Sequence, residues 1–291
     1  MAKNQQQQKQ KKLQLKAAKR KKRELEKKKK EILRKQQEQL NDWIAYAIHL
    51  IEEKNYSDTE KILNKALSAH PEEGYVYYAY GLLYITSGHS DKGISALEKA
   101  IILDPKFAPS YFNLAMAYYK GALLHKMVAT IDKMYKYTSY DAECYIQAEK
   151  LISDTKDTLK EKGNTTLEQY CQDAVTFDKA FDLMSSKSYP EAIELFSSLI
   201  EKEPDHVACH GNIGICYAQM GQKELAINYF DKALAFDPHY ELALVNKTLT
   251  EKLEEGEKLN LEMTSVEYYK DFPLKNKSML EEMQMKLSHQ N

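Results

Sequence analysis

The hydrophobic positions of this chain recur at helical spacing, and glycine and proline interrupt that spacing at regular intervals. Residues 74–107 show the pattern in full. Apolar side chains continue through Tyr80 and Tyr84, stop at Gly88, and then resume until Asp104-Pro105. Residues three and four apart lie on one face of an α-helix. The pattern therefore predicts two amphipathic helices that are joined by a tight turn and ended by a proline.

The same layout returns with a period of 34 residues. Pro71 and Pro105 are 34 residues apart, and so are Pro204 and Pro238. Aligning the chain on these prolines predicts three repeats over 41–139 and two more over 167–240. Two pairs of prolines in register, each with matching apolar positions, make this repeat much more specific than one isolated match.

Close helix packing explains why these residue types recur. Small residues at the eighth, twentieth and twenty-seventh positions of the repeat let helix backbones approach, and large residues fill the spaces between them. Glycine at the fifteenth position, as in Gly88 and Gly221, allows the chain to turn sharply. Proline near the end of the repeat stops the second helix.

This combination resembles the tetratricopeptide repeat (TPR), whose helix pairs stack into a solenoid. The resemblance covers roughly residues 40–255. The fifth repeat, which ends near Pro238, matches the family pattern best, with Ile213, Gly214, Tyr217, Gly221, Ala226, Phe230 and Ala233 in place. It implies an all-α, right-handed TPR superhelix of about five helix pairs, closed by a capping helix over 241–255.

The array is not expected to be uniform. Pro105 and Pro204 are 99 residues apart, three short of three whole periods. We therefore expect a degenerate connecting helix over 140–166, broken at Gly163-Asn164. The run Thr165-Thr166-Leu167-Glu168 has the form of a capping box that starts the next helix. Residues 256–291 lose the period, and we expect a tail there with one weak helix in its Met-rich part.

The first 40 residues differ from the rest in charge. They hold 16 Lys and Arg against 4 Glu, which leaves 26 basic and 39 acidic residues for the remainder. We expect a disordered arm or a solitary charged helix that merges into the first repeat. Its cations form an electrostatic arm: Lys19, Arg20, Lys21, Lys22, Arg23, Lys27, Lys28, Lys29 and Lys30.

Two interpretations of this arm remain open. It binds nucleic acid or an acidic surface through phosphate charges, or serves as a nuclear-import-like signal. Alternatively it is a solubilising extension, as charge runs commonly are. The arm contains no aromatic residue, so base stacking is excluded and any nucleic-acid binding is expected to be salt-sensitive and blind to sequence.

The family resemblance also implies a partner site. In TPR solenoids the first helices line a concave groove, which suits an extended peptide or an amphipathic helix. Mapped onto this sequence, the groove residues are Ile44, Ile48, Tyr75, Tyr78, Leu82, Phe112, Asn113, Met116, Tyr119, Phe177, Phe181, Asn212 and Ile215. The alternative is that many of these side chains pack against helices of the same chain.

One TPR subclass is disfavoured by these residues. TPR domains that grip two carboxylates use Lys and Asn at positions that here hold Ile44 and Ile48, or Phe177 and Phe181. In contrast, Asn113 and Asn212 stand where the family often uses Asn to hydrogen-bond the backbone of a bound peptide.

Catalysis, cofactors and metals are not expected. The sequence has no phosphate-binding GxxxxGK loop, no GxGxxG, no HExxH and no GxSxG. Cys209, His210 and Cys216, with His206 nearby, are conceivable metal ligands. However, the two cysteines are two helical turns apart, and buried soft side chains are the commoner outcome. Together with Cys144 and Cys171 they are expected to stay reduced.

The sequence thus predicts a non-catalytic adaptor that binds a protein or peptide partner. The alternative is a nucleic-acid-associated factor that uses the basic arm. We find no transmembrane segment and no secretory signal, and we expect a cytoplasmic protein. The identity of the partner and the oligomeric state are left open.

Overall fold

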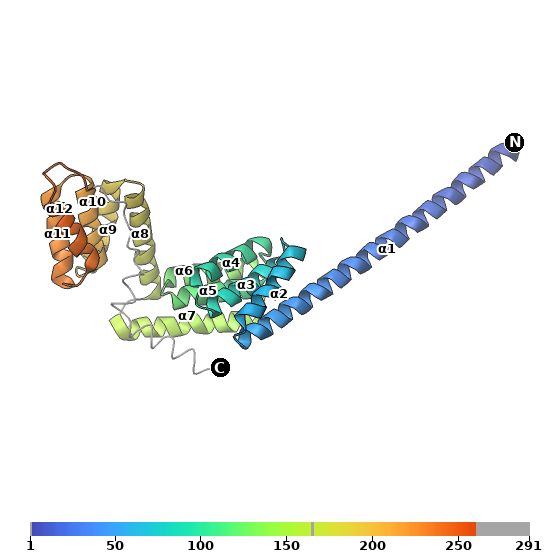
Figure 1. Ribbon diagram of the computed structural model, residues 1–291, viewed down its shortest axis with the longest axis horizontal. Helices are drawn as coiled ribbons and strands as arrows, with labels where there is room; N and C mark the ends of the chain where they lie inside the picture. Colours follow the sequence, from blue (N-terminus) through green and yellow to red (C-terminus); the bar gives the residue numbers. More distant parts are fainter. Residues whose placement is uncertain (1, 164–165, 260–291) are drawn as a thin grey trace. The chain divides into compact units, whose positions relative to one another are not determined.

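The computed structural model describes residues 2–163 and 166–259, and side chains over 19–161 and 166–259. Within these ranges the chain is helical, and it divides into two compact units, Met1–Ser110 and Tyr111–Asn291 (Figure 1). The helices are α1 (Ala2–Glu52), α2 (Tyr56–Ala69), α3 (Gly74–Thr86), α4 (Ser90–Leu103), α5 (Ala108–Lys120), α6 (Leu124–Tyr137), α7 (Ala142–Gly163), α8 (Leu167–Ser185), α9 (Tyr189–Lys202), α10 (Val207–Gln219), α11 (Lys223–Phe236) and α12 (Glu241–Glu251).

The prolines that defined the repeat stand just beyond helix ends, as predicted. α2 and α4 end two residues before Pro71 and Pro105. α9 and α11 end two residues before Pro204 and Pro238. A proline biases its preceding residue away from the helical region, so the helix ends before that residue.

The first unit has two layers of helices. α3 contacts α1, while α2 and α4 pack behind them. Its core draws on α1, α2 and α3: Leu40, Ile44, Ala47, Ile51, Leu63, Ala66, Val76, Ala79, Tyr80 and Leu83. The first four are spaced by three or four residues and so share one face of α1.

The helix α1 joins the charged arm to this core. It runs from Ala2 to Glu52 as one helix. Leu40 is fully buried, whereas every described side chain before it, from residue 19 on, is exposed. The apolar core therefore holds α1 only from Leu40 onward. The division of the chain at residue 40 is still a prediction.

Glycines let the paired helices α3 and α4 come close. A Cβ added at Gly81 would lie 2.6 Å from the Leu97 side chain. One added at Gly93 would lie 3.2 Å from the Gly81 carbonyl oxygen and would overlap the side chain of Ile85. In the second unit, a Cβ at Gly214 of α10 would lie 2.6 Å from the Phe230 ring of α11. The paired helices lie so close at these points that a larger side chain would overlap the facing helix, so glycine is required there.

The second unit repeats the two layers. α10 contacts both α8 and α12, and α9 and α11 pack behind them. Phe177, Phe196 and Phe230 are its largest fully buried side chains. On the α6 side, the buried His125 Nε2 lies 3.0 Å from Asp178 Oδ2, which joins α6 to α8.

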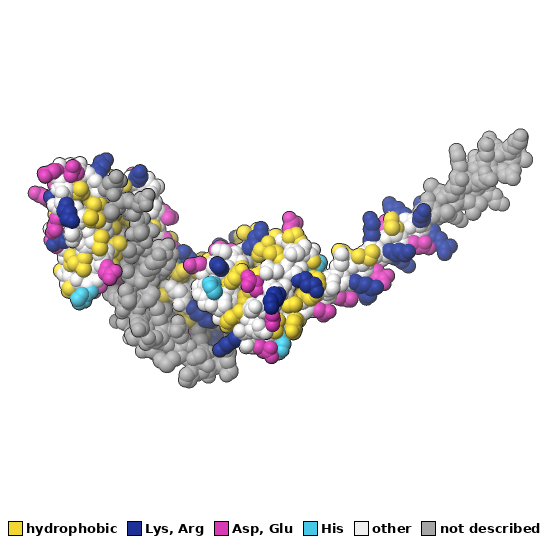
Figure 2. All heavy atoms as spheres, viewed as in Figure 1, with side chains coloured by type: hydrophobic (Ala, Val, Ile, Leu, Met, Phe, Trp, Pro, Cys, Tyr) yellow, Lys and Arg dark blue, Asp and Glu magenta, His cyan; other side chains and the backbone are white. Residues whose placement is uncertain are grey.

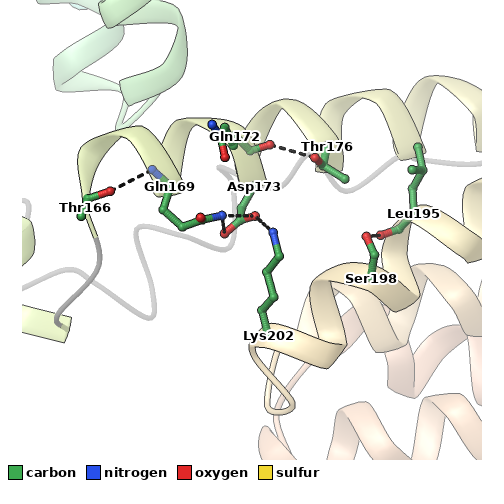
Figure 3. A network of polar contacts seen from close by, with 8 residues as sticks. All are labelled: Thr166, Gln169, Gln172, Asp173, Thr176, Leu195, Ser198 and Lys202. Atoms are coloured by element: carbon green, nitrogen blue, oxygen red, sulfur yellow. Dashed lines mark hydrogen bonds and ion pairs between the residues drawn. The ribbon is translucent and has the colours of Figure 1, made fainter.

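A polar network fixes the start of α8 and joins it to α9 (Figure 3). The Thr166 hydroxyl accepts a hydrogen bond from the Gln169 amide at 3.1 Å. Gln169 donates to Asp173, and Lys202 at the end of α9 pairs with the same carboxylate. The predicted capping box was therefore placed one residue too early: the cap is Thr166, with Gln169 three residues on, since that spacing brings the hydroxyl to a free amide of the first turn.

The predicted final helix and tail are only partly described. α12 ends at Glu251 rather than at residue 255. The chain then turns, with Gly256 at φ +91°. The predicted tail lies outside the described residues from 260 on, and so does the weak helix predicted in its Met-rich part.

The turn between the helices of each pair has one conformation throughout. Its central residue is left-handed at Lys54 (φ 58°), Gly88 (85°), Ala122 (61°), Lys187 (67°) and Gly221 (79°). The next amide donates to the carbonyl five residues earlier in every case: Asn55 to Leu50, His89 to Tyr84, Leu123 to Tyr118, Ser188 to Leu183 and Gln222 to Tyr217, at 2.8–3.0 Å. This is the hydrogen-bond pattern of a Schellman cap. The fifteenth position of the repeat therefore requires a positive φ. Three turns adopt this angle with Lys54, Ala122 or Lys187 in place of glycine.

Lys54→Gly is expected to stabilise the first unit by about 0.5–1 kcal/mol, because glycine adopts a positive φ without the strain that a Cβ imposes. Gly88→Ala is the converse test, since no atom lies within 4 Å of the added Cβ and backbone strain alone is changed. It should cost about 1 kcal/mol. Urea unfolding followed by the emission of Trp43, the single tryptophan, measures both changes in this unit. Equal stability of the two variants would contradict the assignment of backbone strain to the positive-φ residue of the turn.

Candidate protein-binding surfaces

In the first unit, α3 and α1 present an apolar face. Tyr75, Tyr78 and Leu82 of α3 are half-buried, and so is Ile48 of α1. Tyr75, Tyr78 and Leu82 are spaced by three and four residues, so they share one side of α3. We call these four residues the α3 face. Ile44, which was predicted beside them, is fully buried in the core.

The tyrosines of the α3 face are held by an aromatic residue that the groove prediction did not include. The rings of Tyr75 and Tyr78 stack with centroids 5.8 Å apart. Phe107 meets both edge-on, at 5.5 Å and 5.0 Å. Such arrangements are favourable beyond the area they bury. The sequence offered one signal that could have identified Phe107, namely its position two residues after Pro105, at the end of the repeat.

In the second unit, the predicted groove residues divide into half-buried and buried sets. Phe112, Asn113 and Met116 of α5 are half-buried, as is Phe181 of α8. The buried set is Tyr119 at 3% exposure, Phe177 at 1%, Asn212 at 0% and Ile215 at 4%.

The buried residues, with Ile44 of the first unit, correct the prediction of an accessible surface at these positions. Phe177 illustrates the reason: its ring meets Phe196 of α9 edge-on at 5.2 Å and stacks on His206 at 5.7 Å. The sequence position specified a side of the helix, but neighbouring helices decide whether that side is open. These side chains are core residues in the structure.

Asn212 differs from the other buried residues of the predicted groove, because its side chain is an amide. Among the described residues, neither its Oδ1 nor its Nδ2 has a hydrogen-bond partner. A buried amide without partners is costly, so each such group in a native fold requires an explanation.

The cations predicted as an electrostatic arm are all exposed on α1, and Figure 2 shows basic side chains along this part of the helix. At about 100° per residue, positions 19–23 and 27–30 point in every direction around the helix axis. Arg20 pairs with Glu24 at 3.3 Å, and Lys35 with Glu31 at 3.4 Å. Exposed pairs of this kind contribute little to stability. The arm thus carries charge around its circumference rather than on one stripe.

The cysteines and histidines around α10 have structural roles. His206 Nδ1 accepts a hydrogen bond from the Cys209 amide and caps α10. His210 Nε2 lies 2.8 Å from the Pro204 carbonyl oxygen. Cys209 and Cys216 are fully buried, and burial raises the pKa of the Cys216 thiol to about 12. Among the residues with described side chains, no three His, Cys, Asp or Glu side chains gather as metal ligands.

A cavity of about 390 Å³ lies among α6, α7 and α8. Ile131, Ile152 and Leu167 line it, and Lys156 pairs with Glu168 at 2.9 Å beside it. The bond from Lys156 lowers the pKa of the Glu168 carboxyl. Burial raises the pKa of the Cys171 thiol, also in the lining, to about 11. A paired carboxylate and a protonated thiol are poorly suited to acid–base or nucleophilic chemistry near neutral pH.

No helix of the described chain combines the length and the apolar character that crossing a membrane requires.

His210 should make the second unit sensitive to acid. Burial lowers the pKa of its imidazole below the ordinary value of 6.5, although the bond to Pro204 acts in the opposite direction. Its Nδ1 is buried and has no partner within the part of the chain that the structure describes, so protonation would place an unpaired N–H there. The unfolded chain takes up this proton near pH 6.5 and the folded chain only at lower pH, so stability falls as the pH drops from 6.5 toward the folded pKa.

Thermal unfolding by circular dichroism at about pH 7.5 and about pH 5 tests this dependence. The acid-induced loss of stability should be smaller in His210→Gln, whose amide still reaches the Pro204 carbonyl. Trp43 emission gives the first unit as an internal reference. An identical pH dependence in the variant would show that His210 is not responsible.

Comparison with known proteins agrees with this architecture. The family model described as tetratricopeptide repeat matches residues 207–240, and a second model of the same description matches 75–107. Superkiller protein 3 of Schizosaccharomyces pombe is 25% identical over 226 residues, covering 68% of this chain and 16% of that protein. A TPR repeat-containing protein of Methanocaldococcus jannaschii is 25% identical over 231 residues, covering 73% of this chain and 40% of that protein.

The chain therefore spans well under half the length of these relatives. Among solved structures, YrrB, described as a TPR protein with an unusual peptide-binding site, is 19% identical and covers 71% of this chain and 91% of that chain. Its TM-score with this chain is 0.35. The repeat matches, together with the recurring helix pairs and their left-handed turns, identify residues 75–107 and 207–240 as tetratricopeptide repeats.

Proposed function

We propose that this chain is a non-catalytic adaptor that binds a segment of a partner protein on the α3 face. The repeat family is one of protein-interaction scaffolds, which supports the general class of function. The specific support is the half-buried stripe of Tyr75, Tyr78 and Leu82, with Ile48 from the neighbouring α1.

The chemistry of this face favours an apolar, extended or helical ligand. The edge-on contacts with Phe107 limit the motion of both tyrosine rings before any partner arrives. Ordered aromatic side chains lose little conformational entropy on binding, and tyrosine is enriched among residues that dominate binding energy. Apolar side chains spaced along one helix face suit a ligand with two or three apolar anchors.

Alanine substitution of Tyr78 and Leu82 together should weaken partner capture by about tenfold or more. The measurement is an affinity pull-down from the source lysate with nuclease treatment, followed by titration of the captured partner. Tyr46→Ala is the matched control, because this tyrosine lies on α1 with 52% of its surface exposed and outside the α3 face. Trp43 emission verifies that each variant is folded. Undiminished capture by the double variant would exclude this face as the binding site.

A second candidate function, association with nucleic acid, is favoured by the exposed cations of α1. Charge that surrounds a helix offers phosphate contacts in any orientation, with no groove-specific arrangement. Removing residues 1–40 would also remove the fully buried Leu40, so substitution is a cleaner test than deletion.

Substituting Lys27, Lys28, Lys29 and Lys30 by Gln should abolish most of any binding to a generic duplex. The salt dependence of that binding should become shallower, by roughly 0.9 in log–log slope for each phosphate that the arm no longer neutralises. Fluorescence anisotropy of a labelled duplex over a salt series measures both. Exchanging the same residues for Arg keeps the charge and should leave binding intact. If the Gln variant binds as well as the parent chain, the arm has no part in nucleic-acid binding.

A further inference from the structure

The cavity among α6, α7 and α8 has apolar walls and an acidic rim. Ile131 and Leu167 are buried in its lining, and Ile152 is half-buried. Asp132 of α6 and Glu149 of α7 belong to the same lining, but their side chains are exposed. The cavity therefore meets solvent on the side where these carboxylates stand.

The rim carries negative charge that is not neutralised locally. Glu168 has a counter-ion, since Lys156 lies 2.9 Å away. Within the described part of the chain, Asp132 and Glu149 make no ion pair or hydrogen bond. Burial is the main cause that raises the pKa of the Tyr135 phenol in the lining, and Glu149 and Asp132 add to it. The cavity thus favours an occupant that brings a cation beside an apolar group.

The volume of the cavity suits aliphatic side chains. A cavity of about 150 Å³ with Leu, Ile and Phe walls already holds a benzene molecule. The cavity described here has about 390 Å³ and accommodates more than one aliphatic side chain. Filling it removes apolar surface of both the walls and the occupant from water, which is favourable.

The helix α1 carries exposed side chains of this chemistry. Ile32 is 58% exposed and Leu33 69%, and the cations Arg34 and Lys35 follow them directly. Leu25 precedes Ile32 by seven residues, which is two helical turns, and is 56% exposed. We call Leu25, Ile32 and Leu33 the arm patch. Within the described chain both the arm patch and the rim of the cavity are exposed, so one copy leaves both uncovered.

The distribution of charge favours the cavity over a second arm as the place where the arm patch docks. Residues 1–40 hold 16 Lys and Arg against 4 Glu, and the remainder holds 26 against 39 Asp and Glu. Two arms side by side would bring like charges together, which is unfavourable. An arm against the acidic rim brings opposite charges together, and its apolar side chains gain a cavity to fill.

We propose that the arm patch of one copy of this chain docks into the cavity among α6, α7 and α8 of a second copy. Ile32 and Leu33 enter the cavity, and the cations that follow them face Asp132 and Glu149. The contact joins two unlike surfaces, so a single contact leaves one arm patch and one cavity unused. The α3 face takes no part, and the proposal is independent of the proposed adaptor function.

Sedimentation velocity of the purified full-length chain, over concentrations up to about 100 μM, tests this self-association. The average mass should rise with protein concentration and fall as salt is added. Ile32→Gln/Leu33→Gln should weaken the association by roughly tenfold or more. Ile102→Gln/Val245→Gln is the matched control, because these side chains are 72% and 57% exposed on α4 and α12, and it should leave the association unchanged. A parent chain that stays monomeric throughout would overturn the proposal.

Reversing the charge of the rim tests the other side of the contact. Asp132→Lys/Glu149→Lys should weaken the association by roughly tenfold or more, since like charges would then face the arm. Asp157→Lys/Glu201→Lys makes the same change of charge at two exposed positions outside the lining and should have a much smaller effect. Equal effects of the two double variants would show that net charge, rather than the cavity, governs the association.

Mixing the two defective variants distinguishes the proposed contact from its alternatives. Ile32→Gln/Leu33→Gln keeps an intact cavity, and Asp132→Lys/Glu149→Lys keeps an intact arm patch. Each should be monomeric alone, and the mixture should form a heterodimer through the one intact pair of surfaces. Circular dichroism verifies that both variants are folded. Self-association of the rim variant alone would mean that two arms pair, and a mixture without heterodimer would also overturn the assigned contact.

Discussion

A turn with one residue at positive φ joins the two helices of each described pair and sets how their apolar faces meet. Each turn places one residue at positive φ and closes a backbone hydrogen bond from the next amide to the carbonyl five residues earlier. Reversing the chain within so few residues brings the two helices of a pair directly against each other. The register of one apolar face relative to its partner follows from this turn. Lys54, Ala122 and Lys187 show that the same backbone angle persists where glycine is absent.

Side-chain volume then decides which faces close. Where glycine stands on α3 and α10, the facing helices approach until Leu97 and Phe230 fill the space that a Cβ would take. Where the repeat has larger residues at its small positions, as at Met127 and Met134, the side chains are still fully buried. Interiors packed to crystal-like density tolerate such exchanges only when neighbouring volumes compensate. The repeats therefore share one backbone geometry, and different combinations of side chains fill the space between their helices.

The two units differ most on the side that the family resemblance assigns to partners. The α3 face leaves two tyrosines and a leucine partly exposed, held by Phe107. The corresponding side of α10 is buried, and the chain after α12 hydrogen-bonds to Ala218 and Gly221 at the C-terminal end of that helix. The exposed cations of α1 lie apart from the apolar core, which holds this helix only from Leu40 onward. The two proposed modes of binding, apolar recognition and electrostatic attraction, thus fall on different parts of the first unit.

The helix pairs could be predicted from the sequence because their signals are local. The 34-residue spacing of Pro71 and Pro105, the glycine at 88 and the helical period of apolar residues each act on the chain within a few residues. Four helices end two residues before these prolines, as the sequence predicted. The predicted cap of α8 was one residue away from the observed cap, Thr166. The accessibility of the predicted groove residues, in contrast, was set by tertiary packing.

Three residues at groove positions of the repeat show this difference. Ile44 and Phe177 are buried, whereas Tyr78 is half-exposed. Burial depends on neighbours such as Phe107 and Leu259, which lie on other segments of the chain. The periodic pattern of one helix contains no information about such neighbours, so it specifies which side of the helix a residue occupies but not whether that side is covered.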